Sequence, residues 1–231
     1  MVRLLCVLLL CTPTTAFAGA WPRAQGEGFV STTFEFAESD KTITFYGEWG
    51  WSETVTIGFD AYVKEDADEA TLLFFARRQL GQSGPHVWAL GGGVGVTARR
   101  HAPFYFSSDE DRVRGAFLRL SAHYGLGLPN GWFAVDASYD FGREVYWSDG
   151  SSEGVTRRKL DATYGHKLMD AVAAIGQVHT YDDTRSEAIK LVLGLAWTPG
   201  GKAGRTTYES ALQRDIENDE NAIKIGLWRR F

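Results

Sequence analysis

Cysteine is nearly absent from this chain of 231 residues, and both cysteines, Cys6 and Cys11, lie close to its start. They precede a predicted cleavage site, so the expected mature chain has no thiol, no disulfide and no thiolate metal site. Proline is also scarce, at 6 residues against 26 glycines, while aromatic residues reach 13%. This balance favours strands and turns over helices, and a closed sheet is one way to stabilise an exported domain without disulfides.

Long hydrophobic runs are absent as well. The run over residues 4–10 is far shorter than the ~20 residues that a spanning helix needs. Arg3 precedes it, Pro13 ends it, and Ala16-Phe17-Ala18 then places two small residues before Gly19. This is the pattern of a secretory signal peptide with an A-x-A cleavage site. We expect a signal peptide over residues 1–18 and one β-barrel domain over residues 19–231.

An excess of basic residues is missing too. The net charge is −5, which disfavours nucleic acid as a partner. Hydrophobic residues make up 44% of the chain and charged residues 23%, so the composition is not that of a disordered protein. A role in a membrane would therefore have to come from alternating strands rather than from solid hydrophobic blocks.

What the chain does contain is a two-residue alternation of apolar and polar side chains. In residues 54–64, for example, Val55, Ile57 and Phe59 alternate with Thr56 and Asp60. Segments of about ten residues with this period are typical of tilted membrane strands. Twelve segments are predicted: 28–37, 42–49, 54–64, 70–80, 86–99, 115–126, 132–144, 156–167, 171–181, 186–198, 205–216 and 221–231. In segments 70–80, 171–181 and 205–216 the pattern does not decide which side chains face lipid. The last of these segments is also compatible with a short helix.

The connections between these segments alternate in character. Turns rich in Gly, Pro, Asn or Ser, such as 81–85, 128–131 and 199–204, alternate with more polar connections such as 101–114 and 145–154. Short turns at one end and longer charged loops at the other are typical of an outer-membrane barrel, and an even strand count places both termini on the turn side.

Alternation alone also fits a soluble sandwich, in which the apolar face would be internal. The export signal, the strand length, the loop asymmetry and aromatic residues near strand ends favour lipid instead. Those aromatic residues are Trp49, Trp132, Phe133, Trp197 and Trp228, with Phe231 at the C-terminus. The predicted fold is all-β: an antiparallel up-and-down transmembrane barrel of about 12 strands, within a range of 10–12.

Three short stretches also carry a family resemblance. The stretch Gly19-Ala20-Trp21-Pro22-Arg23, the hairpin over residues 45–58 and the last segment Ile225-Gly226-Leu227-Trp228-Arg229-Arg230-Phe231 resemble a poorly characterised group of Gram-negative outer-membrane β-barrel proteins. The resemblance implies the cell outer membrane as location, a lipid bilayer as environment and no catalytic residues. The terminal Phe231 resembles the signal read by the barrel assembly machinery, although Arg229 is a departure from that signal.

Charged side chains on the polar faces are the candidate functional residues. The predicted lumen-lining residues are Arg119, His123, Asp136, Asp140, Lys159, Asp161 and Lys190. One interpretation is a structural network in which opposite charges satisfy one another and fill the barrel. The other is a narrow pore, porin-like, whose charges select small polar solutes. The sequence leaves both open and does not identify the solute.

The sequence gives little support for a catalytic site or a metal site. Ser121 and His123 share a face, but they are two residues apart on one strand, about 7 Å at the backbone, and no G-x-S-x-G motif is present. Because a nucleophilic serine needs a histidine within reach and a third orienting group, the pair is predicted to be non-catalytic. The carboxylates at 109–111, in the same predicted loop as His101, could bind a divalent cation, but their spacing fits no EF-hand. We predict no enzyme activity, no cofactor and no metal.

Overall fold

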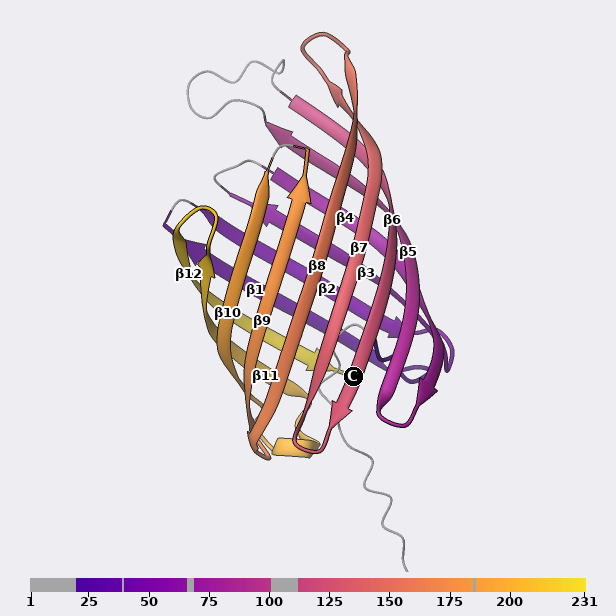
Figure 1. Cartoon of the computed structure of the whole chain (residues 1–231), viewed down its shortest axis with the longest axis vertical. Helices are drawn as coiled ribbons and strands as arrows, with labels where there is room; N and C mark the ends of the chain where they lie inside the picture. The colour runs from indigo at the N-terminus through magenta and orange to yellow at the C-terminus, as the bar shows by residue number, and fades with distance from the viewer. Residues whose placement is uncertain (1–19, 39, 66–68, 101–111, 185) are drawn as a thin grey trace, which may run out of the picture.

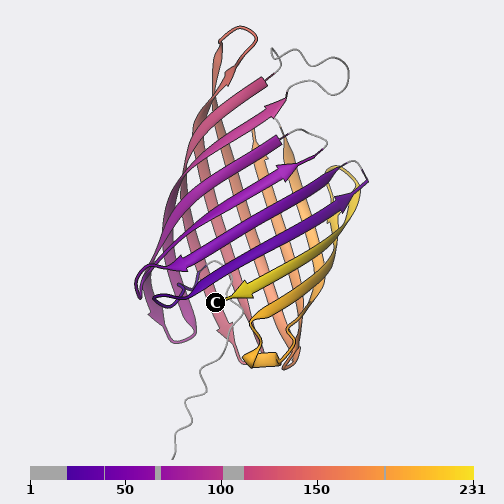
Figure 2. The same cartoon turned by 180° about the vertical axis from the view of Figure 1, so that it is seen from behind.

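The chain folds into a closed barrel of twelve antiparallel strands. The computed structural model describes residues 20–38, 40–65, 69–100, 112–184 and 186–231. Each strand pairs with its neighbour in sequence, and β1 pairs with β12, which closes the barrel (Figures 1 and 2). Closure leaves no unpaired sheet edge, as a sheet surrounded by lipid requires.

Strand bounds agree closely with the alternation in the sequence. The strands are β1 (Gly28–Ala37), β2 (Lys41–Gly50), β3 (Val55–Lys64), β4 (Glu69–Ser83), β5 (His86–Arg100), β6 (Arg112–Leu128), β7 (Gly131–Tyr146), β8 (Ser152–Met169), β9 (Val172–Asp183), β10 (Glu187–Trp197), β11 (Thr206–Asp215) and β12 (Glu220–Arg230). The prediction of about 12 strands is confirmed, and β11 is a strand rather than a helix. A short 3-10 helix, η2 (Gly201–Ala203), lies in the turn before it.

Strands β4 to β8 are longer than predicted, at 15 to 18 residues. Residues 145–154 were expected to form a loop, but Val145 pairs with Ser152 and Glu144 with Glu153. The ladder continues because the buried Glu144 is held there by Arg99 and Arg157. This hairpin rises beyond the rest of the barrel at the end opposite the C-terminus (Figure 1).

The two ends of the barrel differ. Turns β2–β3, β4–β5, β6–β7, β8–β9 and β10–β11 lie at one end, which we call the turn side, together with the C-terminus (Figure 1). At that end Gly84, Gly200 and Gly201 have positive φ, a conformation that glycine adopts without steric cost. In the described part of the chain, no helix has the length and apolar character needed to cross a bilayer.

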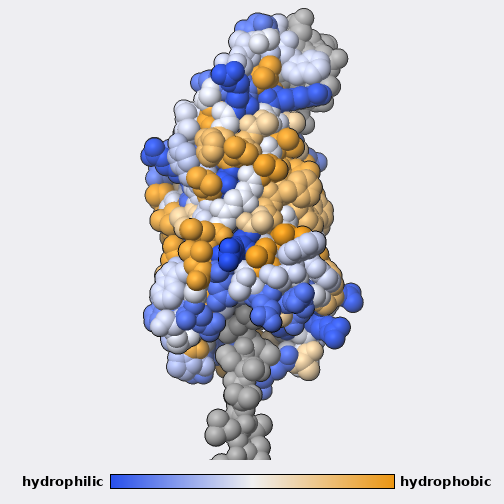
Figure 3. Space-filling model, turned by 90° about the vertical axis from the view of Figure 1, so that its right-hand side faces the viewer, coloured by the Kyte–Doolittle hydropathy of each residue, from blue (hydrophilic) through white to orange (hydrophobic). Residues whose placement is uncertain are grey.

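The outward face of the barrel is apolar around its middle. Leu193 (72% exposed), Leu212 (68%) and Leu120 (60%) are among many exposed large hydrophobic side chains. On the face that Figure 3 shows, hydrophobic side chains gather in a band around the middle, with hydrophilic residues towards both ends. The ambiguous β4 is also settled, because Phe74 is exposed at 56% whereas Leu73 is buried at 3%. The four consecutive apolar residues 72–75 thus contribute side chains to both the interior and the outer face.

The glycines of β5 face a crowded interior. A Cβ added at Gly95 would overlap the ring of Phe117, and one at Gly93 would lie 2.9 Å from Cδ1 of Leu73. These glycines leave room for large side chains from the adjacent strands. The described interior is therefore filled on this side by Phe117, Leu73 and the charged groups described next.

Candidate functional site: the polar lumen and its turn-side vestibule

Ion pairs, most of them between strands, involve every charged residue singled out in the sequence. Arg119 donates to both carboxylate oxygens of Asp140 at 2.6 and 2.8 Å. Lys190 contacts Glu35, which lies on β1, at 3.1 Å. Because β10 and β1 are not neighbours, the last pair reaches across the inside of the barrel.

Lys159 and Asp161 belong to the same interior network. Lys159 lies 2.9 Å from Asp161, whose other carboxylate oxygen contacts Nδ1 of His179 at 2.9 Å. His179 comes from β9, the strand whose facing was ambiguous in the sequence. The aspartate thus joins β8 to β9, and each charge in the cluster has an opposite or hydrogen-bonding partner.

A second cluster, near the turn side, was not predicted. Glu48 is buried, with 2% of its side chain exposed, between two arginines. Nε of Arg23 lies 2.5 Å from Oε2 of Glu48, and Arg77 lies 2.6 Å from Oε1, which also accepts a hydrogen bond from the hydroxyl of Tyr46. Two cations around one buried carboxylate leave a net positive centre in the lumen.

A matching cluster occupies the other half of the lumen. Glu144 again has 2% of its side chain exposed and pairs with Arg157 at 2.9 Å and with Arg99. The guanidinium of Arg157 also lies 5.5 Å from the centre of the Phe117 ring. Both buried glutamates therefore carry two arginines each. The sequence alone does not reveal which arginines pair with each glutamate, because the partners come from strands that are distant along the chain.

Ser121, His123 and Asp136 form a connected set. Nε2 of His123 lies 2.9 Å from Oγ of Ser121, and Nδ1 lies 2.6 Å from Oδ1 of Asp136. The backbone separation that argued against the serine–histidine pair does not keep the side chains apart, because both point inward and the imidazole lies over Ser121. Asp136 comes from β7, where it is the register partner of His123. The expectation of unfavourable geometry for this pair is wrong.

The stretch before β1, residues 20–27, crosses the turn-side end, and we call it the N-terminal strap. Ala20 is fully buried, and Trp21 takes the place of a side chain at Gly125, where an added Cβ would lie 2.6 Å from its ring. The amide of Arg23 donates to Oγ1 of Thr56 at 3.0 Å. The resemblance in the sequence included part of this strap, but its position inside the barrel was not predicted.

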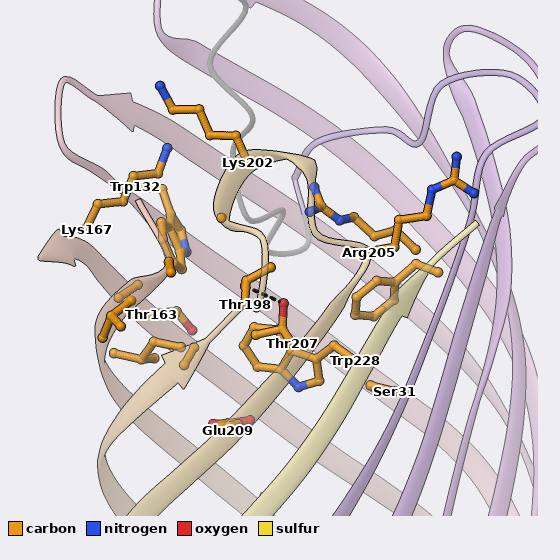
Figure 4. A pocket seen from close by; sticks show the side chains of 18 of the residues that line it. Ser31, Trp132, Thr163, Lys167, Thr198, Lys202, Arg205, Thr207, Glu209 and Trp228 are labelled. Carbon is orange, nitrogen blue, oxygen red and sulfur yellow. Dashed lines mark hydrogen bonds between the residues drawn. The ribbon is translucent and has the colours of Figure 1, made fainter. Parts of the chain in front are cut away.

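Beside the strap lies a cavity of about 320 Å³, the turn-side vestibule. Its lining includes six basic residues, namely Arg23, Lys167, Lys202, Arg205, Lys224 and Arg230, and only two acidic ones, Asp170 and Glu209. Figure 4 shows Lys167, Lys202 and Arg205 around the hydrogen-bonded pair Thr198 and Thr207, whose oxygens are 2.7 Å apart. The vestibule is therefore a concave and predominantly cationic surface.

Two tryptophans and Phe29 form the aromatic part of the vestibule. Trp132, with 3% exposure, packs with Ile175 and Ala196, and Trp228 packs against the same cluster (Figure 4). Trp132 lies near the start of β7, as predicted, and its side chain fills the barrel end over Gly165 rather than facing outward. Trp228 likewise lines the vestibule, whereas Trp49 and Trp197 are exposed as a belt requires.

Some predicted features remain untested. The carboxylates at 109–111 and His101 lie outside the described residues, as do residues 1–18. Within the part of the chain that the structure describes, no group of three or more His, Cys, Asp or Glu residues is arranged to hold a metal ion.

Comparison with known proteins identifies the fold and no family. No family model matches the chain, and no curated protein matches its sequence. Among solved structures, a KdgM porin in complex with disordered oligogalacturonate superposes with a TM-score of 0.61 at 7% identity, covering 88% of this chain and 99% of that one. The NanC porin gives 0.53 at 14%, covering 87% and 98%. The β domain of the Bordetella autotransporter BrkA gives 0.51 at 11%, covering 90% and 99%.

These neighbours are outer-membrane barrels, and two of them are porins. At such low identity the similarity establishes the architecture, a porin-like barrel of twelve strands, and nothing about the solute.

Proposed function

We propose that this chain is an outer-membrane pore, exported by the signal peptide 1–18, whose turn-side vestibule admits small anionic solutes. The observation that carries this proposal is the excess of basic over acidic side chains around the vestibule. Rings of Arg and Lys favour anions in pores, and a cavity with low-dielectric walls concentrates their field. Transport, rather than a chemical reaction, is the principal role that we propose.

The solute class follows from the lining. The faces of Trp132 and Trp228 offer flat apolar surfaces, and Lys202 and Arg205 are exposed at the turn side. A ring-shaped solute with a carboxylate would contact both kinds of group. The ligand in the KdgM complex, an oligogalacturonate, has this chemistry, which makes sugar acids a suitable first probe.

The apolar outer surface supports the same proposal. The hydrophobic band in Figure 3 would face acyl chains, and Phe231 would serve as the signal for the barrel assembly machinery. The exposed Trp49 and Trp197 would then lie at the headgroup level, where aromatic side chains are enriched.

A second candidate function is a non-conducting barrel with a structural or interaction role. The observation that favours it is the N-terminal strap, which closes part of the turn side, together with the ion clusters around Glu48 and Glu144. Buried, fully paired charges fill a lumen without conducting.

Uptake into proteoliposomes separates the two candidates. Galacturonate and galactose have similar rings and differ in a carboxylate, so the pore proposal predicts faster entry of galacturonate. The double variant Lys202→Glu/Arg205→Glu should lower that preference, whereas Lys41→Glu, at an exposed position on the opposite end, should not. Entry of neither sugar through correctly folded barrels would favour the non-conducting candidate.

A further inference from the structure

The lumen holds a serine, a histidine and an aspartate in the order of a nucleophile, a base and an orienting group. Oγ of Ser121 is 2.9 Å from Nε2 of His123, and Nδ1 of His123 is 2.6 Å from Asp136. An ionised carboxylate only accepts hydrogen bonds, so Asp136 fixes the proton on Nδ1. Nε2 is then the acceptor for the serine hydroxyl, which is the arrangement that activates a serine.

The neighbouring strand β5 leaves space beside Ser121. Gly91 on β5 is the register partner of Ser121, and an added Cβ there would lie 2.5 Å from Oγ of Ser121 and 3.4 Å from Nε2 of His123. Any other residue at this position would press on the Ser121–His123 contact. The glycine therefore keeps one side of the hydroxyl open.

A cation stands on the same row of the sheet. Arg77 is the register partner of Gly91, so it is two strands from Ser121. Among the described residues, Nε of Arg77 is one of three buried side-chain atoms without a hydrogen-bond partner. A buried donor of this kind is suited to a negative charge that forms only during a reaction.

Solvent reaches this set from the lumen. The side chain of Asp136 is 28% exposed and that of His123 is 13% exposed, in contrast to the fully enclosed Glu48 and Glu144. The partial exposure allows a small molecule to approach.

We infer that Ser121, His123 and Asp136 form a nucleophilic site that accepts acyl groups from small esters entering the lumen. Oγ of Ser121 bonds to the carbonyl carbon while its proton moves to Nε2 of His123. The ester bond then breaks, and the departing alkoxide takes that proton and leaves as the alcohol. A water molecule next gives a proton to His123 and attacks the acyl carbon, which releases the carboxylic acid and returns the proton to Ser121. Asp136 acts as a positioning residue, because it holds Nδ1 of His123.

The test is covalent labelling of the full, folded chain by a small alkyl fluorophosphonate. Ser121 would displace fluoride and form a stable bond to phosphorus, and peptide mass spectrometry would locate the adduct without any substitution. Ser138 is a matched control, because it is the register partner of Ser121 on β7 and belongs to the same inward row. We expect an adduct on Ser121 and none on Ser138.

Variants then test the base and the positioning residue. His123→Ala should slow labelling by about 10²–10⁴-fold, the usual contribution of a general base. Asp136→Asn should slow it as well, because the amide no longer fixes the tautomer, while Ser138→Ala should leave the rate unchanged. Heat-modifiable migration would show that each variant is folded. No adduct on Ser121, equal labelling of both serines, or an unchanged rate in His123→Ala would overturn the inference, whatever the outcome of the uptake experiment.

Discussion

The amide of Gly28 donates to the carbonyl oxygen of Phe231 at 2.8 Å, and the amide of Phe231 donates back to Gly28 at 3.0 Å. The terminal residue therefore completes the seam between β1 and β12 that closes the barrel. Its ring lies beside the Cα of Gly28, where an added Cβ would overlap it, and 6.2 Å from the ring of Trp49.

This contact predicts the effect of changing the C-terminus. Phe231→Ala removes the ring but keeps the backbone pair with Gly28, so the folded barrel should remain stable. If Phe231 also serves as an assembly signal, the yield in the outer membrane should fall while refolding in detergent is unaffected. Equal losses in cells and in detergent would instead indicate a packing role only.

The buried glutamate near the strap should be essential for stability. Glu48→Gln leaves Arg23 and Arg77 without their counter-charge inside the barrel, which typically costs about 3–5 kcal/mol. Glu65→Gln is the control, because the Lys41–Glu65 pair is exposed and should contribute about 0–1 kcal/mol. Denaturant unfolding in detergent measures both, and comparable midpoints for the two variants would contradict the prediction.

A glycine substitution tests the packing of the interior. Gly95→Ala should be destabilising by about 1–3 kcal/mol because the new methyl group overlaps the Phe117 ring. Gly154→Ala provides the comparison, since an added Cβ there meets nothing within 4 Å. The unfolding midpoint should fall for the first variant and stay unchanged or rise slightly for the second.

The apolar outer face makes a depth-dependent prediction. Leu193→Arg, in the middle of β10, should destabilise the barrel in a bilayer by about 2–4 kcal/mol, and Ile216→Arg, just beyond β11, by about 0–1 kcal/mol. Refolding yield into vesicles against denaturant concentration measures the difference. Similar effects at both positions would mean that the exposed stripe does not lie in lipid.

The sequence was sufficient to predict the number of strands and, for most of them, the lipid-facing side. The period of two determines both, and residues 54–64 show it without interruption. β4 was ambiguous because a crowded interior accepts Leu73 as readily as lipid accepts Phe74. The length of β7 and β8 was underestimated because polar residues such as Glu144 also continue a strand when partners such as Arg157 compensate them.

Contacts between strands were beyond prediction. A single sequence does not state the register, and register alone brings Asp136 to His123. The same holds for the strap, since nothing in its composition indicates that Trp21 covers Gly125. The inward charged positions could be predicted from alternation. The inward orientation of Trp132 could not, because an aromatic residue at a strand end fits either an outer belt or a filled barrel end.

The central functional claim is a pore with a cationic vestibule, and the reversal potential of single channels in a planar bilayer under a KCl gradient tests it most directly. The account predicts step-like openings with a reversal potential displaced towards chloride, and a smaller displacement for Lys202→Glu/Arg205→Glu. A displacement towards potassium, or an absence of openings from folded, heat-modifiable barrels, would contradict it.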